Sequence, residues 1–144
     1  MRINPEITAL TAEYWDGLLN QRLLLQKCAT CTAIWHPPEP VCPMCQSADV
    51  EWVEASGFGT LYSYTWVHHA THEVFRDDVP YLVVLVDLLE GPRLVSTIHG
   101  QTVGALPIGA QVRAVYPGAG DRDEGLVTFE FIENADANQE TKAP

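Results

Sequence analysis

The sequence predicts a mainly β chain that begins with a short N-terminal helix, continues through a small four-cysteine ribbon and ends in a five-stranded barrel. Two observations predict this fold class. All four cysteines stand in two C-x-x-C pairs, Cys28 with Cys31 and Cys42 with Cys45, and past Gly57 short apolar segments alternate with turn-rich segments. We therefore expect four parts in chain order: a helical segment (1–22), the ribbon (23–56), the barrel (57–133) and a disordered tail (134–144).

The first expected element is an amphipathic helix that starts near Thr11, a suitable N-cap residue. Tyr14, Trp15 and Leu18 recur at the spacing of one helix face. Gly17 inside this helix costs about 1 kcal/mol relative to alanine, so the helix needs a surface on which to dock. The apolar residues have two interpretations, packing on the chain's own domain or contact with a partner protein, and the sequence leaves both open.

The two C-x-x-C pairs predict a metal site. Each pair makes a tight turn that brings two thiolates to one side, so two facing pairs offer a tetrahedral ligand set. Zinc is the expected ion, with iron as the alternative, and four thiolates fill the coordination shell, so the metal would be structural. Metal ligation also supplies free energy that so short a stretch cannot gain from a core. A dithiol redox centre and two disulfides are the competing interpretations.

Period-2 patterns predict the strands. Two segments, Leu23 to Cys28 and Val50 to Glu54, are expected to form the ribbon. Five short strands in about 75 residues are typical of a small closed barrel, of which the OB-fold is the commonest. The expected barrel strands are Thr60 to His69, Tyr81 to Leu88, Arg93 to His99, Gly109 to Tyr116 and Leu126 to Ile132.

Several short motifs follow one another in a fixed order. They are Leu24 to Lys27 before the first cysteine pair, Pro37-Pro38, Pro43-Met44 inside the second pair, Gly57 to Thr65, Pro80-Tyr81 with the apolar run after it, and Ile108-Gly109. In this order they resemble the acyl-CoA-associated OB-fold proteins with an N-terminal rubredoxin-like zinc ribbon, catalogued as domain of unknown function thirty-five. The resemblance covers nearly all of the chain that we expect to be ordered.

The resemblance implies a non-catalytic accessory subunit that binds a thiolase-like or hydratase enzyme and helps to hold or channel an acyl-CoA thioester. Two positions depart from the family pattern: Thr32 stands where glycine is common, and Glu39 where arginine is common. The first departure requires Thr32, a non-glycine residue, to adopt the backbone conformation of a tight turn. The second removes a cation that would favour contact of the ribbon with CoA phosphates.

Within this implied role, we expect Arg76 and Arg93 to contact acyl-CoA, with the partner enzyme supplying the remaining positive charge. The loop 70–79 between the first two barrel strands is a second candidate contact surface, because apolar Val74 and Phe75 stand among its charged residues. The candidate partner-binding residues are Tyr14, Trp15, Leu18 and Phe75.

The charge balance bears on the alternatives. A formal charge of −11 weighs against nucleic acid as a partner, because such binders neutralise phosphates. Strand alternation nevertheless places Tyr62, Tyr64 and Trp66 on one face, which keeps a binder of single-stranded nucleic acid as an alternative, beside a stand-alone acyl-CoA enzyme. His68, His69 and His72 are interpreted as a second metal site or, more simply, as loop histidines.

Targeting signals are not evident in the sequence. The first residues do not combine a basic region with a long apolar one, and no run of about 18 apolar residues occurs. We therefore expect a cytoplasmic protein without a membrane span.

Overall fold

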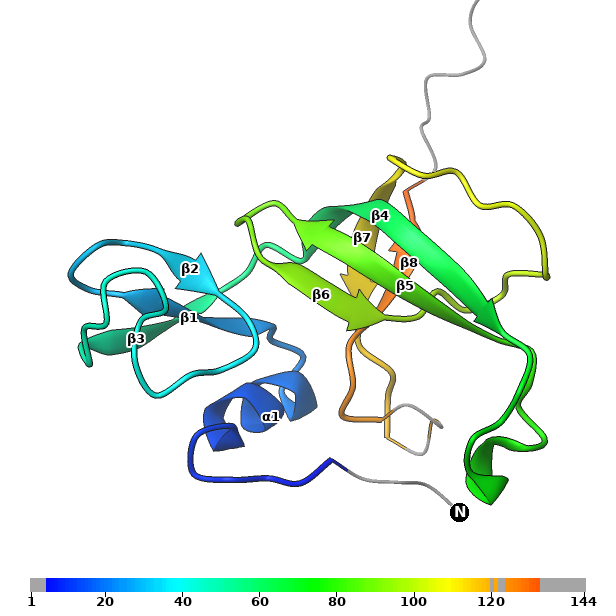
Figure 1. Ribbon diagram of the computed structural model, residues 1–144, viewed down its shortest axis with the longest axis horizontal. Coiled ribbons are helices and arrows are strands. Elements are labelled where there is room, and N and C mark those ends of the chain that lie inside the picture. The colour runs from blue at the N-terminus through cyan, green and yellow to red at the C-terminus, as the bar shows by residue number, and fades with distance from the viewer. Residues whose placement is uncertain (1–4, 120, 122–123, 133–144) are drawn as a thin grey trace, which may run out of the picture.

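The computed structural model describes residues 5–119, 121 and 124–132, and within these ranges the chain is mainly β with one α-helix. Figure 1 shows a smaller sheet of β1 to β3 beside a larger sheet of β4 to β8, with α1 below the junction between them. The predicted fold class is therefore confirmed. The predicted tail, 134–144, lies outside the described residues.

The helix α1 (Ala12–Leu19) packs its apolar side on the chain itself. Tyr14 and Leu18 are only 6% and 3% exposed. Gly17 permits this close approach, because a Cβ atom there would lie 2.8 Å from the Leu24 Cγ atom and 2.9 Å from the Arg22 carbonyl oxygen. A helix of eight residues is marginal alone, so this docking stabilises it.

Thr11 occupies the N-cap position, but its side chain does not cap the helix. The Thr11 Oγ1 atom instead accepts a hydrogen bond from the Thr8 backbone N–H at 3.0 Å. The Thr8 carbonyl accepts from the N–H groups of Thr11 and Ala12 at 3.1 and 2.9 Å. The predicted N-cap position is therefore correct, but a preceding turn takes the place of a side-chain capping bond.

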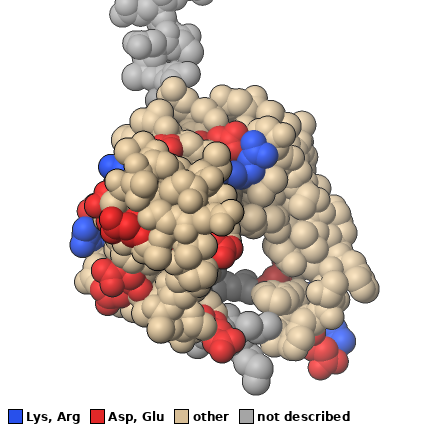
Figure 2. Space-filling view, turned by 60° about the vertical axis from the view of Figure 1, so that its left-hand side comes forward, with Lys and Arg blue, Asp and Glu red and all other residues tan. Residues whose placement is uncertain are grey.

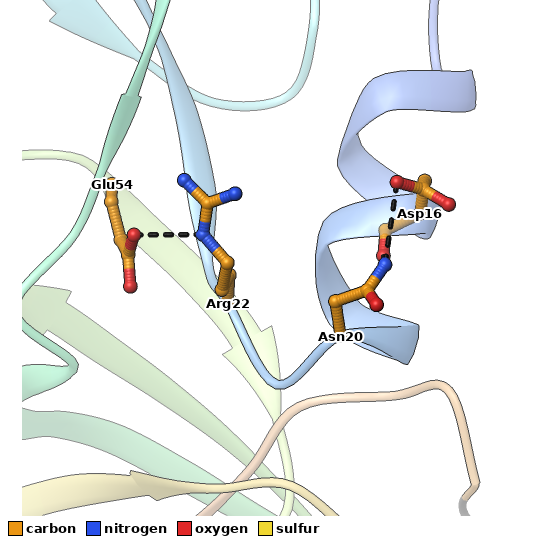
Figure 3. A network of polar contacts seen from close by, with 4 residues as sticks. All are labelled: Asp16, Asn20, Arg22 and Glu54. Carbon is orange, nitrogen blue, oxygen red and sulfur yellow. Dashed lines mark hydrogen bonds and ion pairs between the residues drawn. The ribbon is translucent and has the colours of Figure 1, made fainter.

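The ribbon is an antiparallel sheet in which β1 (Leu24–Cys28) lies between β2 (Ile34–Trp35) and β3 (Val50–Glu54). The first and last of these strands match the predicted segments. The sequence did not predict β2, because a two-residue strand before two prolines has no period to detect. Arg22 and Glu54 form an ion pair with a 2.8 Å distance from Nε to Oε2 (Figure 3).

The larger sheet has the strand order β6-β5-β4-β7-β8, and every neighbouring pair in it is antiparallel. Its strands are β4 (Phe58–Val67), β5 (Tyr81–Leu88), β6 (Arg93–Ser96), β7 (Gln111–Val115) and β8 (Thr128–Phe131). Within residues 5–119, 121 and 124–132, no continuous ladder closes the sheet. Among the described residues, one parallel bridge between Ile98 and Phe129 joins its two edges, which corrects the expectation of a fully closed barrel.

A β-bulge in β4 changes which side chains share a face. Leu61 pairs with Val86 and Ser63 with Leu85, so Tyr62 is an extra residue in the ladder. Beyond the bulge, Tyr64 and Trp66 turn toward the core, whereas Tyr62 remains exposed. The predicted common face of Tyr62, Tyr64 and Trp66 is therefore wrong, because a bulge reverses the alternation.

The core of the barrel continues into the ribbon and the helix. Buried residues from all three parts form one cluster, which includes Tyr14, Leu25, Ala55, Leu61 and Phe129. The ribbon and the barrel are therefore not independently packed bodies.

The connection between ribbon and barrel is also held by specific contacts. The Ser56 N–H donates to Glu90 Oε1 in the β5–β6 turn at 2.6 Å. A Cβ atom on Gly59 would lie 2.5 Å from the Asp87 carbonyl oxygen. The G-x-G sequence at this point therefore serves close strand packing.

The loop between β4 and β5 contains a 3-10 turn, η1 (Glu73–Phe75). Its His72 side chain accepts a hydrogen bond from the Val74 N–H at Nδ1. Among the described residues, no helix has the length and apolar character needed to cross a membrane.

Candidate metal centre and exposed surfaces

The two cysteine pairs come together at one point of the ribbon. The four Sγ atoms lie within 4.8 Å of one another. Two of the sulfur–sulfur distances are 3.6 Å, between Cys28 and Cys45, and 3.5 Å, between Cys31 and Cys42. These distances are too long for disulfide bonds of about 2.05 Å. They suit a metal-centred tetrahedron, whose edge is about 3.8 Å when metal–sulfur bonds are about 2.3 Å.

The two halves of the centre have matching turns. The Thr32 N–H donates to the Cys28 carbonyl at 3.0 Å, and the Gln46 N–H donates to the Cys42 carbonyl at 2.9 Å. Thr32 and Gln46 both have positive φ angles, 65° and 63°. This confirms that Thr32, a non-glycine residue, adopts the left-handed conformation that the first turn requires. Gln46 does the same in the second turn.

Backbone N–H groups point at two of the sulfurs. The Cys31 N–H donates to Cys28 Sγ and the Met44 N–H donates to Cys42 Sγ, both at 3.4 Å. The Cys31 N–H is the main reason that the pKa of Cys28 is lowered to about 6. Such bonds favour the thiolate form, which is the form that ligates metals.

Neighbouring side chains support this arrangement. The Thr30 and Ser47 hydroxyl oxygens lie 2.9 Å apart and join the two cysteine turns. Trp35 packs against Cys28 and Cys42, all three of which are buried. The residues therefore fit one metal ion held by four thiolates, which would leave no coordination position for a substrate.

The two candidate CoA contacts lie far apart. Arg93 follows the β5–β6 turn and pairs with Asp87, whereas Arg76 precedes β5 beside η1. The part of β5 between Tyr81 and Asp87 alone spans about 20 Å, at roughly 3.3 Å per residue. The structure therefore does not bring Arg76 and Arg93 into one site.

The two arginines also differ in accessibility. Arg93 is engaged on both sides: its Nε and Nη2 atoms donate to the Asp87 carboxylate at 2.6 and 3.1 Å, and its guanidinium covers the Tyr62 ring. These bonds lower the pKa of Asp87. Arg76 forms an ion pair with Glu73 at 3.2 Å, and both side chains are largely exposed. Arg76 is therefore the more accessible of the two cations.

The four residues predicted to bind a partner differ in how far they are buried. Tyr14 and Leu18 are buried within the chain, which agrees with the first of the two interpretations that the sequence left open. Trp15 and Phe75 are partly buried. Phe75 packs near Tyr81 with 6.0 Å between ring centroids, and Trp15 lies at the edge of a groove.

This α1 groove has a volume of about 200 Å³ and lies between the N-terminal segment, the helix and the chain leading into β8. Its lining includes Pro5, Ile7, Trp15, Leu19, Glu124 and Leu126. No sequence pattern predicted the groove. Leu19 follows Trp15 by four residues and so shares its helix face, but the contribution from before β8 has no local signal.

A second hollow of about 440 Å³ lies on the outer side of the larger sheet. Its lining includes Phe58, Thr60, Asp87, Leu89, Gln111 and Ile132. Phe58 and Leu89 are exposed apolar side chains. No sequence pattern predicted this hollow either, because it lies between the ends of four strands that are far apart along the chain.

The histidines do not gather into a site. Among the described residues, the four cysteines are the only group of cysteine, histidine and acidic side chains close enough to hold a metal. His68, His69 and His72 are all exposed.

The charge is unevenly spread over the surface. On the face shown in Figure 2, acidic side chains gather at the left and along the lower edge, and a broad area without charged residues lies to the right. A base-stacking surface on β4 is not formed, since the bulge separates Tyr62 from the other two aromatic residues.

Two family models match consecutive parts of the chain. Residues 15–51 match the rubredoxin-like zinc ribbon domain of ChsH2, and residues 52–116 match its C-terminal OB-fold domain. A solved structure described as the Ltp2-ChsH2(DUF35) aldolase is similar with a TM-score of 0.77 and 38% identity, covering 89% of this chain and 98% of that one.

Similar proteins include a scaffold protein and a hydratase subunit. A DUF35 domain-containing scaffold protein of Methanocaldococcus jannaschii is 33% identical over 73% of this chain and 75% of its own length. A probable enoyl-CoA hydratase alpha subunit of Thermomonospora curvata is 41% identical over 78% of this chain. The chain spans only 34% of that hydratase subunit.

Three findings indicate the same two-part chain. They are the similarity to the scaffold protein over most of its length, the two family matches, and the geometry of the four sulfurs. The chain belongs to the DUF35 family, with a four-cysteine metal-binding ribbon of the rubredoxin-like type followed by an OB-fold domain.

Proposed function

We propose that this chain is a non-catalytic accessory subunit of an enzyme complex that acts on acyl-CoA thioesters. In this role the ribbon holds a structural zinc ion, and the combined ribbon and barrel form a rigid platform for a thiolase-like or hydratase subunit. The observation that carries the proposal is that four cysteine sulfurs fill the coordination shell of one metal ion. The ribbon that holds them shares its core with the barrel. A metal held in this way stabilises the fold of the ribbon and has no coordination position at which a substrate could bind.

Relatives support the choice of partner class. The chain resembles a hydratase alpha subunit, a scaffold protein and the DUF35 component of an aldolase assembly. A shared region in proteins with such different names suggests an assembly role that is common to several reactions. Aldolase and hydratase subunits are therefore both suitable partners to test.

We further propose that Trp15 and Phe75 contribute to the partner surface, because both keep part of their aromatic surface accessible. Tyr14 and Leu18 would act indirectly, by fixing α1 on the ribbon.

A direct contact with CoA is assigned to Arg76 in preference to Arg93, whose guanidinium already bonds to Asp87. The partner would supply most of the positive charge for the CoA phosphates, since this chain has a formal charge of −11.

Co-purification from the native host tests the assembly role. The tagged chain is expressed at its native level, and proteins that elute with it in equal amounts are identified by mass spectrometry. We expect a thiolase-like or hydratase subunit, and acyl-CoA turnover by the complex but not by the chain alone. Recovery of the chain without such a subunit, with bound RNA or DNA, or with full turnover on its own would refute the proposal.

The CoA contact needs a separate measurement. Arg76→Ala should weaken CoA binding by the assembled complex, and Arg93→Ala serves as the matched comparison. A larger loss from Arg93→Ala would reverse the assignment.

A further inference from the structure

The α1 groove has the physical properties of a protein docking site. Its lining is largely apolar, and two apolar side chains at its edge, Ile7 and Leu19, are 62% and 61% exposed. Leu19 packs close to Gly125, where an added Cβ atom would come within 3.1 Å of Leu19 Cδ2. The groove therefore has a defined wall on the β8 side and an open, apolar edge on the helix side.

A hydrogen-bond donor on a side chain that lines the groove has no acceptor among the described residues. The indole Nε1 atom of Trp15 is buried, and among the described residues it has no hydrogen-bond partner. A buried donor without an acceptor is destabilising, so a small shift of the indole ring that brings this nitrogen to an oxygen atom of an occupant would be favourable. Trp66 provides a contrast, because its indole N–H donates to the Gly104 carbonyl at 2.9 Å.

Acidic residues near the groove bear on the charge of a suitable occupant. Glu6 adjoins Ile7, and Asp16 lies one helical turn before Leu19, whereas Glu124 in the lining already has an interaction within the chain. Within residues 5–21, lysine and arginine do not occur. Figure 3 shows Asp16 on α1 bonded to Asn20, the residue that follows the helix, and separate from the ion pair between Arg22 and Glu54. An occupant with positive charge beside its apolar side chains is favoured.

We propose that the α1 groove binds a basic, apolar segment of the partner enzyme subunit, and that a backbone carbonyl of this segment accepts the Trp15 indole N–H. This inference rests on the proposed accessory role and specifies where the enzyme subunit docks. A second copy of this chain is a less suitable occupant, because each copy has a formal charge of −11 and presents the same acidic rim.

Binding of single-site variants to the co-purified enzyme subunit, expressed separately, tests the location. Leu19→Asp should weaken binding at least about tenfold, because it places a charge in the apolar contact. Ile108→Asp is the matched control, since Ile108 is 63% exposed and lies outside the groove. It should change the dissociation constant by less than about twofold. Circular dichroism and thermal unfolding check that both variants remain folded.

Two further measurements test the chemistry of the occupant. Trp15→Phe retains most of the apolar surface but removes the donor, and should weaken binding roughly three- to tenfold. Asp16→Asn should reduce the salt dependence of the dissociation constant.

Nuclear magnetic resonance of the tryptophan indole groups gives a direct view of the hydrogen bond. On binding, the Trp15 Nε1–H resonance should shift and become protected from exchange. The Trp66 resonance is the internal reference, because that group already donates to Gly104.

The outcomes separate the two proposals. If the wild-type chain binds the enzyme subunit but Leu19→Asp binds equally well, or Leu19→Asp and Ile108→Asp weaken it equally, the groove assignment is wrong and the accessory role stands. If the wild-type chain binds no acyl-CoA enzyme subunit, both fail. Light scattering that shows a dimer in wild type and a monomer in Leu19→Asp would assign the groove to a second copy and overturn the inference.

Discussion

The guanidinium carbon of Arg93 lies 3.3 Å from the centre of the Tyr62 ring, while two nitrogens of the same group donate to the Asp87 carboxylate. The β-bulge makes this contact possible, because it leaves Tyr62 on the outer surface when the following aromatic residues turn inward. Arg93 is thus part of a three-residue arrangement that joins β4, β5 and β6.

Replacement of Arg93 tests this arrangement. Arg93→Lys keeps the charge but loses the paired hydrogen bonds and the flat stacking surface, so the free energy of unfolding should fall by about 1 kcal/mol. Urea unfolding measures the change. Arg76→Lys, at an exposed pair within one turn, is the control and should change the stability by less than about 0.5 kcal/mol. Equal effects from the two variants would contradict the assignment.

Removal of one sulfur should abolish metal binding. Wild-type protein is expected to contain one zinc ion per chain by elemental analysis, and Cys42→Ser should contain almost none. Because the ribbon and barrel share a core, hydrogen exchange should increase in both, with the larger increase in the ribbon. Ser47→Ala, which removes the hydroxyl contacts with Thr30 and with the Asp49 N–H but no sulfur, should retain the metal. Full metal content in Cys42→Ser would refute the ligand assignment.

His36 should make stability depend on pH. Its ring lies 5.0 Å from the Tyr14 ring by centroid distance, and burial lowers the pKa of His36. The neutral form is therefore favoured in the folded state. This contribution is fully present above the unfolded pKa of about 6.5 and is lost as the pH falls through the lowered folded value.

Thermal unfolding between about pH 8 and pH 5 measures the effect of His36. The melting temperature of the wild type should fall over the acidic part of this range, and His36→Phe should show a smaller decrease. Parallel curves for the two proteins would exclude His36 as the source.

Gly17→Ala separates helix propensity from packing. Propensity alone predicts a gain of about 1 kcal/mol in an α-helix. The structure predicts a loss of roughly 1–3 kcal/mol, because the new methyl group would meet the Arg22 carbonyl oxygen and the Leu24 side chain. Gly104→Ala is the control, since its nearest neighbour would lie 3.8 Å away. Chemical unfolding that shows Gly17→Ala to be stabilising would contradict the packing described for α1.

Tyr64 and Trp66 hold the loop between β6 and β7. The Leu106 N–H donates to the Tyr64 hydroxyl oxygen at 3.1 Å, and the Trp66 indole donates to the Gly104 carbonyl. Tyr64→Phe should therefore increase the exchange rate of the Leu106 amide about fivefold, as expected for loss of about 1 kcal/mol. The Val84 amide in β5 should be unaffected. An unchanged Leu106 rate would mean that this bond does not hold the loop.

Local patterns predicted most of the fold. The C-x-x-C spacing identified all four sulfurs that the structure gathers, and the bounds expected for β3 and β5 match those observed. Both depend on short-range sequence, either the geometry of a turn or the period of a strand. The helix was also predicted, and Thr11 occupies its N-cap position as expected, although its side-chain oxygen bonds to the Thr8 N–H and does not cap the helix.

Features that depend on distant parts of the chain were not predictable in this way. The bulge at Tyr62 depends on the register between β4 and β5, which no alternation within β4 records. The separation of Arg76 from Arg93 depends on the length and direction of β5. The α1 groove requires Leu126 to approach Trp15, and this approach follows from the shared core.

The bonds that position the loop between β6 and β7 end on main-chain atoms, at the Leu106 nitrogen and the Gly104 oxygen. Every amino acid has such a carbonyl, and every amino acid except proline has such an N–H group. Substitutions in this loop can therefore change its outer chemistry while leaving its path intact. The surface chemistry of this loop, and with it any binding specificity of the loop, can therefore change without a change of fold.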